Sequence, residues 1–308
     1  MNNPNTQHIL VVGSSNTDMV VKAGHLPRPG ETILGGTFFM NPGGKGANQA
    51  VAAARLGGQV TFICKTGNDI FGNQAKQLFE NEGIDTSFVF SDSEYPSGVA
   101  LITVDDKGEN CIVVASGANA HLTPDDLSTA HEAIENAGII LMQLEIPIET
   151  VKYVADVARK SGKKLILNPA PAQPLDRELL KSLDLITPNE TEAEMISGIK
   201  IIDTDSLYDC ARTIFEMGVQ TVIITLGAKG AFIYNDAFQE LVPSCEVVAV
   251  DSTAAGDVFN GALAVAISEG CDLPVAVRFA NRAAAISVTR IGAQASAPYR
   301  DELMNDFE

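Results

Sequence analysis

The stretch VDSTAAGDVFNGALAVAI spans residues 250–267 and places one carboxylate, Asp257, inside an apolar run. The apolar residues from about Val258 onward predict a buried helix. Small residues before it leave the backbone N–H groups of Ala255, Gly256 and Asp257 open at the positive end of that helix, an arrangement that can bind an anion. The carboxylate beside these donors can accept a proton from a hydroxyl group. The stretch therefore predicts a buried helix that carries an anion site and a candidate base.

A simpler interpretation of Asp257 is a first-turn acid that stabilises the helix dipole. That effect is worth only about 0.3–1 kcal/mol. It does not require the small residues that precede the carboxylate, and burying an ionised carboxylate is costly. We therefore favour the functional interpretation.

Length and composition exclude several classes of protein. A chain of 308 residues, 45% hydrophobic, predicts one large domain, and 21 basic against 39 acidic residues give a formal charge of -18. This charge disfavours nucleic acid and anionic membranes as partners. The N-terminus lacks the basic start of a signal peptide, and no run of about 18 apolar residues occurs. Five scattered cysteines and four histidines form no metal-binding motif, so we expect a cytoplasmic protein with reduced thiols.

Short apolar strands alternate with segments of helical pattern along most of the chain. The strands are expected at residues 8–12, 60–64, 138–144, 164–167, 184–186 and 221–226, and residues 246–250 are strand-like as well. Such alternation predicts an α/β fold, a three-layer sandwich in which helices cover both faces of a mostly parallel sheet. The glycines of LGAKG (226–230) predict a hairpin after the last of the six strands.

Two regions, residues 17–42 and 96–116, do not follow this alternation of strands and helices. Polar and apolar residues alternate there around Gly and Pro turns, as they do in antiparallel strands. We expect a single domain over residues 1–308 with a small β-sheet lid inserted from these two regions. The alternative is that they merely extend the main sheet.

The segment GSSNTD, residues 13–18, follows the first strand, where doubly wound folds bind ligands. Asn16 and Asp18 are two positions apart, so on an extended chain they point the same way and can hold neighbouring sugar hydroxyls. Capping of a local turn by these side chains is the alternative. The G-x-G-x-x-G motif of dinucleotide folds is absent, which disfavours an oxidoreductase.

The segment NPGGKGANQA, residues 41–50, places glycines before a helix rich in small residues. Glycines there allow close approach of a ligand to the backbone. The segment is not a Walker A loop, because Gly46 and not Ser or Thr follows Lys45. The amide of Asn48 must find partners in such a segment, which favours a binding site over a plain turn.

The segment ITPNETEAE, residues 186–194, leads from a strand into an acidic helix start. Thr187 and Glu190 have the spacing of a capping box. Asn189 and Glu192 are not needed for that cap and share a helix face, which suits a hydrated Mg²⁺ and a phosphate.

Three segments, GGKGANQA (43–50), TPNETE (187–192) and DSTAAGD (251–257), resemble in order and spacing the signatures of the ribokinase family of sugar and nucleoside kinases. The resemblance extends from Leu10 to about Pro298. It implies an α/β sandwich with a β lid that forms a homodimer interface, and transfer of the γ-phosphoryl group of ATP to the 5-hydroxyl of D-ribose. The alternatives are a fructokinase, an adenosine-type nucleoside kinase and, from another class, a non-catalytic sugar-binding protein.

The resemblance also implies roles for individual residues. Asp257 is expected to be the general base, beside an anion hole formed by the N–H groups of Ala255 and Gly256. The expected ribose ligands, besides Asp257, are Asn16, Asp18, Gly44, Lys45, Asn48 and Glu145. The expected nucleotide site contains Asn189, Thr225, Gly227, Gly230, Gly256 and Asn281, and Glu192 is expected to order the hydrated Mg²⁺. An activating K⁺ is expected at Asp251, Thr253, Ser287, Arg290, Gly292 and Ser296.

Two positions depart from the family pattern. Ala254 stands where many members have Gly, and we expect its methyl group to be tolerated provided that its φ is not positive. Asn281 stands where His also occurs in the family, so the adenine contact there is the least specific of the assignments.

Overall fold

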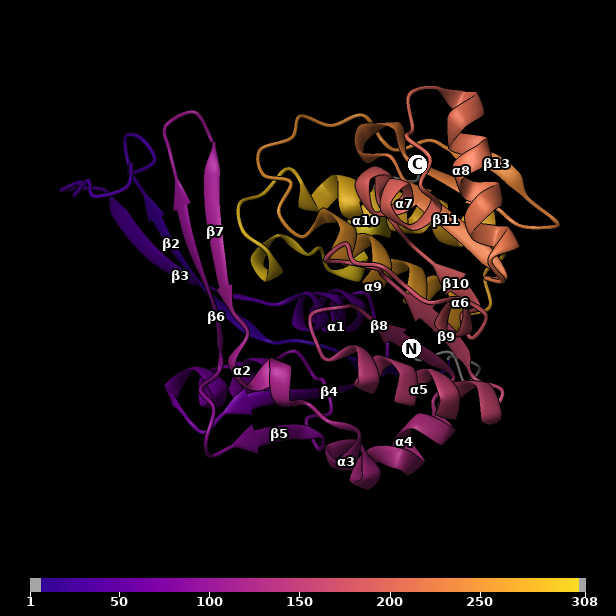
Figure 1. The fold of residues 1–308 in the computed structure, drawn as a ribbon, viewed down its shortest axis with the longest axis horizontal. Helices are drawn as coiled ribbons and strands as arrows, with labels where there is room; N and C mark the ends of the chain where they lie inside the picture. The colour runs from indigo at the N-terminus through magenta and orange to yellow at the C-terminus, as the bar shows by residue number, and fades with distance from the viewer. Residues whose placement is uncertain (1–6, 305–308) are drawn as a thin grey trace.

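The main element of the fold is a nine-stranded sheet, seen in a computed structural model that describes residues 7–304 (Figure 1). Its strand order is β13-β12-β11-β10-β9-β8-β1-β4-β5, and all neighbours are parallel except β11–β12 and β12–β13. The strands are β1 Ile9–Val12, β4 Val60–Gly67, β5 Val89–Asp92, β8 Ile139–Met142, β9 Lys164–Leu167, β10 Leu185–Ile186, β11 Thr221–Thr225, β12 Ala231–Tyr234 and β13 Gln239–Val242. All six expected strands and the expected hairpin are confirmed.

Helices cover both faces of this sheet, as the three-layer prediction requires. Along β1, Ile9 and Val11 belong to one buried cluster and Leu10 and Val12 to another, because successive side chains of a strand point to opposite faces. The first cluster includes side chains of α1 Lys45–Arg55, α2 Ile70–Asn81, α9 Ala255–Ser268 and α10 Leu273–Ser287. The second includes side chains of α3 Pro124–Leu127, α4 His131–Asn136, α5 Ile148–Lys160, α6 Arg177–Leu180, α7 Glu190–Ser197 and α8 Thr204–Glu216. A last short helix, α11, covers Arg300–Met304.

Close packing of α1 on α9 positions the site described below. A Cβ on Gly261 of α9 would lie 2.7 Å from the carbonyl oxygen of Gln49 and 2.8 Å from Cβ of Ala52. Only glycine allows that approach without a shift of the backbone. The sequence of α9 is apolar because the helix is buried between its neighbours, with Leu263 and Val265 fully inaccessible. No helix of the described residues is long and apolar enough to cross a membrane.

A second, four-stranded sheet stands apart from the main one, at the left of Figure 1. Its order is β3-β2-β6-β7, with β2 Asn16–Lys22, β3 Thr37–Gly43, β6 Gly98–Val104 and β7 Asn110–Ala115. The hairpin pairs are antiparallel, whereas the central pair β2–β6 is parallel because two separate insertions meet there. The alternative of an extended main sheet is wrong.

The expected strand at residues 246–250 is not formed. No strand of the described structure pairs with it, and the N–H groups of Val250 and Asp251 instead donate to the carbonyl of Val288 after α10. Val248 is 85% exposed. The β-branched valines of this segment favour a strand, but without a neighbouring strand edge they do not form a ladder.

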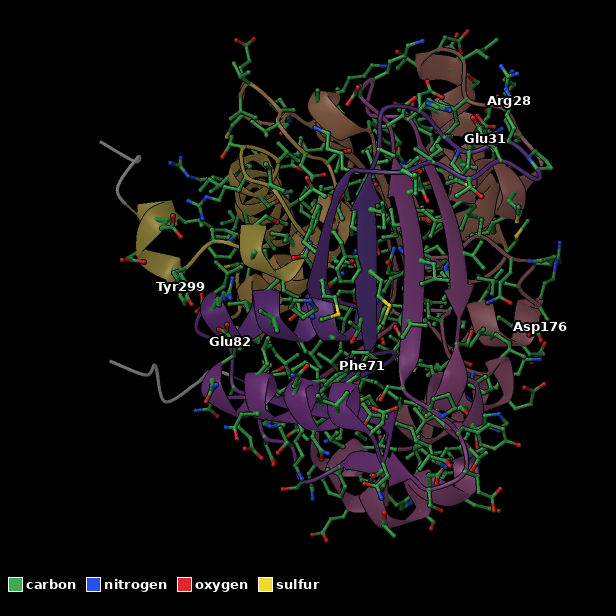
Figure 2. All side chains as sticks on the ribbon, turned by 90° about the vertical axis from the view of Figure 1, so that its left-hand side faces the viewer. Arg28, Glu31, Phe71, Glu82, Asp176 and Tyr299 are labelled. Carbon is green, nitrogen blue, oxygen red and sulfur yellow. The ribbon has the colours of Figure 1, made fainter. Side chains whose placement is uncertain are left out.

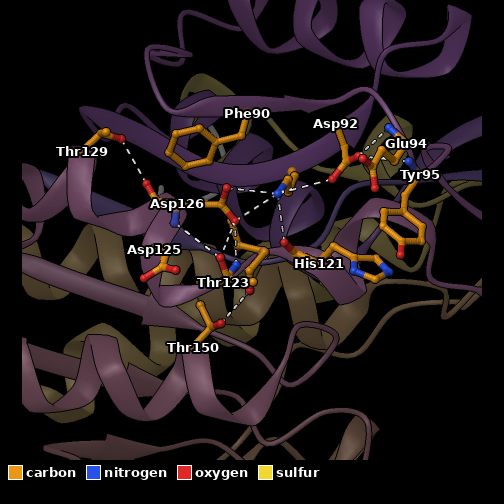
Figure 3. A network of polar contacts seen from close by, with 12 residues as sticks. Phe90, Asp92, Glu94, Tyr95, His121, Thr123, Asp125, Asp126, Thr129 and Thr150 are labelled. Carbon is orange, nitrogen blue, oxygen red and sulfur yellow. Dashed lines mark hydrogen bonds and ion pairs between the residues drawn. The ribbon is translucent and has the colours of Figure 1, made fainter.

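Hydrogen bonds and ion pairs of the half-buried Lys65 fix the outer edge of the main sheet (Figure 3). Nζ of Lys65 on β4 donates to the Asp126 carboxylate and to the carbonyl of His121, both at 3.0 Å, and forms an ion pair with Asp92 at 3.3 Å. The Asp126 carboxylate also accepts from the Thr123 N–H, closing the capping box of α3. One cation thus joins β4, β5 and the start of α3.

Candidate active site

The predicted site residues gather where the N-termini of α1 and α9 meet the carboxyl ends of strands of the main sheet. A pocket of 220 Å³ opens there. It is lined by Lys45, Asn168, Ala170, Thr187, Asn189, Glu192, Thr225, Ser252, Ala254, Ala255, Gly256, Asp257 and Asn260. Three distant segments of the sequence therefore contribute to one pocket, as their motifs predict.

Asp257 lies in the first turn of α9 and is 5% exposed. Nδ2 of Asn48 donates to its Oδ2 at 2.9 Å, and Nε2 of Gln49 donates to its Oδ1 at 3.0 Å. Burial raises the pKa of Asp257, and the Lys45 charge and the two amide hydrogen bonds only partly oppose it. The carboxylate is therefore held in one orientation with a pKa shifted toward neutrality, which suits a proton acceptor.

Lys45 is the basic side chain of this pocket lining. Burial by itself lowers its pKa, but the charges of Asp257, Glu145 and Glu192 outweigh burial and leave the pKa raised. Lys45 thus stays protonated at neutral pH and balances part of the negative charge gathered around it.

At the helix start the N–H of Ala255 donates to the carbonyl of Ser252 at 3.2 Å, so this expected donor is occupied, whereas the N–H groups of Gly256 and Asp257 have no hydrogen-bond partner among the described residues. A Cβ on Gly256 would meet no atom within 4 Å, so the space above these donors is free for an anion. Ala254 adopts φ 59 and ψ 12, the left-handed region. The condition under which its methyl was expected to be tolerated is therefore not met, and Ala254 carries the strain that glycine would avoid. Among described residues it is the single non-glycine with positive φ.

Asn16 and Asp18 share one face of β2. The carboxylates of Glu145 and Asp257 are close enough to Asp18 to act on its charge. Burial, together with the charges of Glu145 and Asp257, raises the pKa of Asp18 to about 6. Oε2 of Glu145 accepts from the N–H of Lys45 at 3.0 Å, which caps the start of α1. The predicted sugar ligands are thereby brought together, Gly44 included, whose φ of 90 turns β3 into α1.

Asn48 uses its amide nitrogen on Asp257, while its Oδ1 is buried and has no hydrogen-bond partner among the described residues. A buried carbonyl oxygen without a partner costs about 1–3 kcal/mol. A ligand hydroxyl would supply the missing donor. The expectation that the amide of Asn48 finds partners is met by its nitrogen, while its oxygen is left for a ligand.

A chain of buried amides behind Asp257 was not predicted as functional. Gln143, just after β8, donates to Oε1 of Gln49, and Gln49 donates to Oδ1 of Asn168 as well as to Asp257. Asn168 follows β9, and its Nδ2 donates to the carbonyl of Thr187 after β10. A polar amide directly after each of several buried apolar strands is the sequence signal that would have identified them.

The acidic helix start differs from the prediction in one respect. Asn189 and Glu192 themselves form the reciprocal capping box of α7, and Thr187 lies before the helix, where its hydroxyl donates to Asn260. The inference that capping does not need Asn189 and Glu192 is wrong, because the helix begins at Glu190. Both side chains nevertheless line the pocket, and burial raises the pKa of Glu192.

The remaining nucleotide candidates surround the turn after β11. Thr225 forms an isolated parallel bridge with Asn189, which joins the turn to the pocket. Gly227 has φ +57 and Gly230 has φ +103, and a Cβ on Gly230 would lie 2.1 Å from the carbonyl oxygen of Val242. Asn281 is buried on α10 and donates to that same carbonyl at 2.9 Å. Its amide nitrogen is therefore used to hold the loop after β13.

Among the candidate cation ligands, Asp251, Thr253 and Gly292 are joined by hydrogen bonds. Oδ1 of Asp251 accepts from the N–H and the hydroxyl of Thr253, and its Oδ2 accepts from the N–H of Gly292 at 2.9 Å. The hydroxyls of Ser287 and Ser296 donate to backbone carbonyls three residues earlier, and Arg290 pairs with Glu302. Within residues 7–304 no group of three or more His, Cys, Asp or Glu side chains has metal-binding geometry.

A mostly parallel sheet, a buried carboxylate and an open helix N-terminus together define an α/β phosphotransferase that acts on a hydroxyl group. The family model described as pfkB family carbohydrate kinase matches residues 6–300, and the chain belongs to this family.

Similar proteins cover nearly the whole chain. Ribokinase of Haemophilus influenzae is 45% identical over 300 residues, which is 97% of this chain and 98% of that one. Deoxyribokinase of Salmonella typhi is 38% identical over 291 residues, 94% and 95% of the two chains. The structure of Arabidopsis thaliana ribokinase complexed with ribose and ATP has a TM-score of 0.90 at 34% identity and covers 98% and 100%.

Proposed function

We propose that the protein transfers the γ-phosphoryl group of ATP to the 5-hydroxyl of D-ribose. The observation that carries the proposal is Asp257, whose buried carboxylate lies in the first turn of α9 beside the N–H of Gly256 and is held through both oxygens by amides of α1. Ribokinases 39–45% identical over almost the full chain support ribose as the acceptor.

In the proposed reaction, Asp257 accepts the proton of the 5-hydroxyl as its oxygen attacks the γ-phosphorus. The bond from that phosphorus to the β–γ bridging oxygen breaks, and ADP leaves with the electron pair. The N–H of Gly256 stabilises charge on the transferring oxygens, since backbone donors at a helix N-terminus are aligned for an anion. The N–H of Ala255 joins it by exchanging its hydrogen bond to the Ser252 carbonyl for one to the phosphoryl group. Asn16, Asp18, Gly44, Lys45, Asn48 and Glu145 are the proposed ribose ligands.

ATP is proposed to lie along the turn after β11 and to point its phosphates at the start of α9. Asn189, Thr225, Gly227, Gly230, Gly256 and Asn281 are the proposed residues of this site. The carboxylate of Glu192 suits a hydrated Mg²⁺, because Mg²⁺ keeps several waters and needs few protein ligands. That ion would supply neutralising charge to the phosphates.

The loops around Asp251 fit a monovalent cation. The hydrogen bond from Gly292 to Asp251 brings residues 251–253 against the turn after α10. Carbonyl oxygens of such loops are suitable ligands for K⁺, and Asp251, Thr253, Ser287, Arg290, Gly292 and Ser296 are proposed to hold it. A bound cation would stabilise the loop that leads into the anion hole.

The four-stranded sheet is proposed to act as a lid over ribose and as a homodimer interface. Asn16 and Asp18 lie on β2 of this sheet, and the charges of Glu145 and Asp257 act on the Asp18 carboxylate. On its other face the register aligns Met19 with Met40 and Leu101, and Leu101 with Val113. Met40, Leu101 and Val113 are 51%, 52% and 62% exposed, a row of apolar side chains that a second copy would cover.

A coupled ADP-release assay over D-ribose, 2-deoxy-D-ribose, D-fructose and adenosine tests the substrate. We expect the highest kcat/KM for ribose. Deoxyribose belongs in the panel because a deoxyribokinase is 38% identical over 94% of the chain. A clear preference for fructose, adenosine or deoxyribose would contradict the proposed acceptor, and no ADP release with any acceptor would contradict kinase activity.

A further inference from the structure

A second cavity, also of 220 Å³, lies between helix α2 and the ends of β2 and β3 that adjoin the main body. Figure 2 shows Phe71 of α2 directly below the small sheet. The cavity is lined by Ser15, Asn16, Thr17, Met40, Asn41, Pro42, Phe71, Gln74, Ala75, Leu78, Phe79 and Gln294. A single water needs only about 10–15 Å³, so there is room for a small organic molecule.

This cavity is distinct from the phosphotransfer pocket. Thr17 and Asp18 are neighbours on β2, so their side chains point to opposite faces of the small sheet. Asp18 is coupled electrostatically to Glu145 and Asp257. Thr17 and its partner in register, Pro42, line the second cavity. The proposed ribose site and this cavity therefore lie on opposite sides of the root of the sheet and share one residue, Asn16, which borders both.

Gln294 supplies the observation that indicates a ligand. Its residue is 2% exposed, and its backbone carbonyl is fixed by Nη1 of Arg55 at 2.6 Å. Its side-chain Nε2 and Oε1 are both buried and have no hydrogen-bond partner among residues 7–304. Each such group costs about 1–3 kcal/mol. The lining of the cavity therefore contains one donor and one acceptor that are unpaired among the described residues.

The lining defines the chemistry of that partner. No charged side chain contributes to it, in contrast to the phosphotransfer pocket with Lys45, Glu192 and Asp257. Phe71, Met40 and other apolar groups suit C–H faces, and the Gln294 amide suits hydroxyls, which both donate and accept. We propose that this cavity binds one small, neutral, polyhydroxylated molecule against the Gln294 amide.

Equilibrium dialysis of radiolabelled erythritol against the full chain tests the proposal. D-ribose and ATP are omitted, because ribose is itself a small, neutral, polyhydroxylated molecule that would compete for the cavity. We expect saturable binding of one erythritol per chain. Gln294→Met removes both polar atoms at similar volume, and Ala75→Phe fills the cavity from α2 without touching Gln294. Both substitutions should weaken binding at least tenfold. The two cavity variants separate binding in this cavity from binding in the phosphotransfer pocket.

Gln77→Ala is the matched control, because Gln77 is an exposed glutamine on the same helix that does not line the cavity. It should bind erythritol like the unmodified chain. Saturable binding lost in both cavity variants and kept in the control supports the proposal, even if the phosphoryl acceptor proves not to be ribose. Absence of saturable binding to the unmodified chain, or equal binding by all variants, would overturn it and leave the cavity to water alone.

Discussion

Nδ2 of Asn48 donates to Oδ2 of Asp257 at 2.9 Å, although the two residues are 209 positions apart in the chain. The neighbouring Gln49 holds the other carboxylate oxygen. Both donors lie in the first turns of α1, so the orientation of the proposed base depends on how α1 packs against α9. The contact at Gly261 fixes that packing.

Replacing Gln49 with Leu should shift the pH dependence of kcat to higher pH. The Gln49 hydrogen bond favours the ionised form of Asp257 and lowers its pKa, so its loss raises the pKa further. A hydrogen bond to a charged group is worth about 1.5–3 kcal/mol, which corresponds to a shift of about one unit or more in the acidic limb. Gln77→Leu on exposed α2 is the control. An unchanged acidic limb in Gln49→Leu would show that Gln49 does not control the pKa of the proposed base.

Replacing Asp18 with Asn should stabilise the fold at pH 8 while weakening ribose binding. The folded-state pKa of Asp18 is raised from 3.8 to about 6, so its contribution to stability is full below pH 3.8 and is lost as pH rises through 6. Asn cannot ionise and avoids this loss, which is worth up to about 3 kcal/mol at 1.36 kcal/mol per unit. Urea unfolding at pH 8 and near pH 3.5 measures the difference. The gain should be absent at the lower pH, and an equal gain at both would refute the electrostatic explanation.

Replacing Ala254 with Gly should raise the free energy of unfolding by about 1 kcal/mol, because an L-residue in the left-handed region costs about 1–2 kcal/mol. Ala284→Gly in the interior of α10 is the matched control. Its φ is helical, so glycine should lower stability there by about 1 kcal/mol. Thermal unfolding of both variants shows whether each substitution raises or lowers the free energy of unfolding. Destabilisation of similar size in both would mean that Ala254 carries no strain.

Exchange of K⁺ for Na⁺ should lower activity. The loop held by Asp251 leads directly into the helix start at Ala255, so a poorly fitting cation would disturb the proposed anion hole. Initial rates at equal ionic strength in KCl and NaCl measure the effect, and Asp251→Asn should reduce the difference between the salts. Equal rates of the unmodified chain in both salts would remove the cation from the mechanism.

The fold was predictable because its strands are short, apolar and separated by helical segments. The order of the strands in the sheet was not predictable from pattern alone, nor was the parallel pairing of β2 with β6, since that pairing joins two insertions. Residues 246–250 are the exception. Their valines suit a strand, but no strand edge is available to them in the described structure.

The candidate site was predictable where a motif contains the side chain that lines the pocket, as for Asp257 and Lys45, or that contacts the carboxylate, as for Asn48. Gln143 and Asn168 were missed because each stands alone after a strand and acts only through tertiary contacts. The capping box was assigned two residues too early because Thr187 and Asn189 both suit a helix start. Tertiary hydrogen bonds decided between them, since the Thr187 hydroxyl is used on Asn260.

The most direct test of the account is kcat of Asp257→Asn with D-ribose and ATP, with ribose binding measured in parallel by calorimetry. Asn has nearly the same shape as Asp but cannot accept the proton. The account predicts a kcat lower by about 10²–10⁴-fold, the usual contribution of a general base, with ribose still bound. A kcat near that of the unmodified enzyme would contradict the assignment of Asp257 as the base.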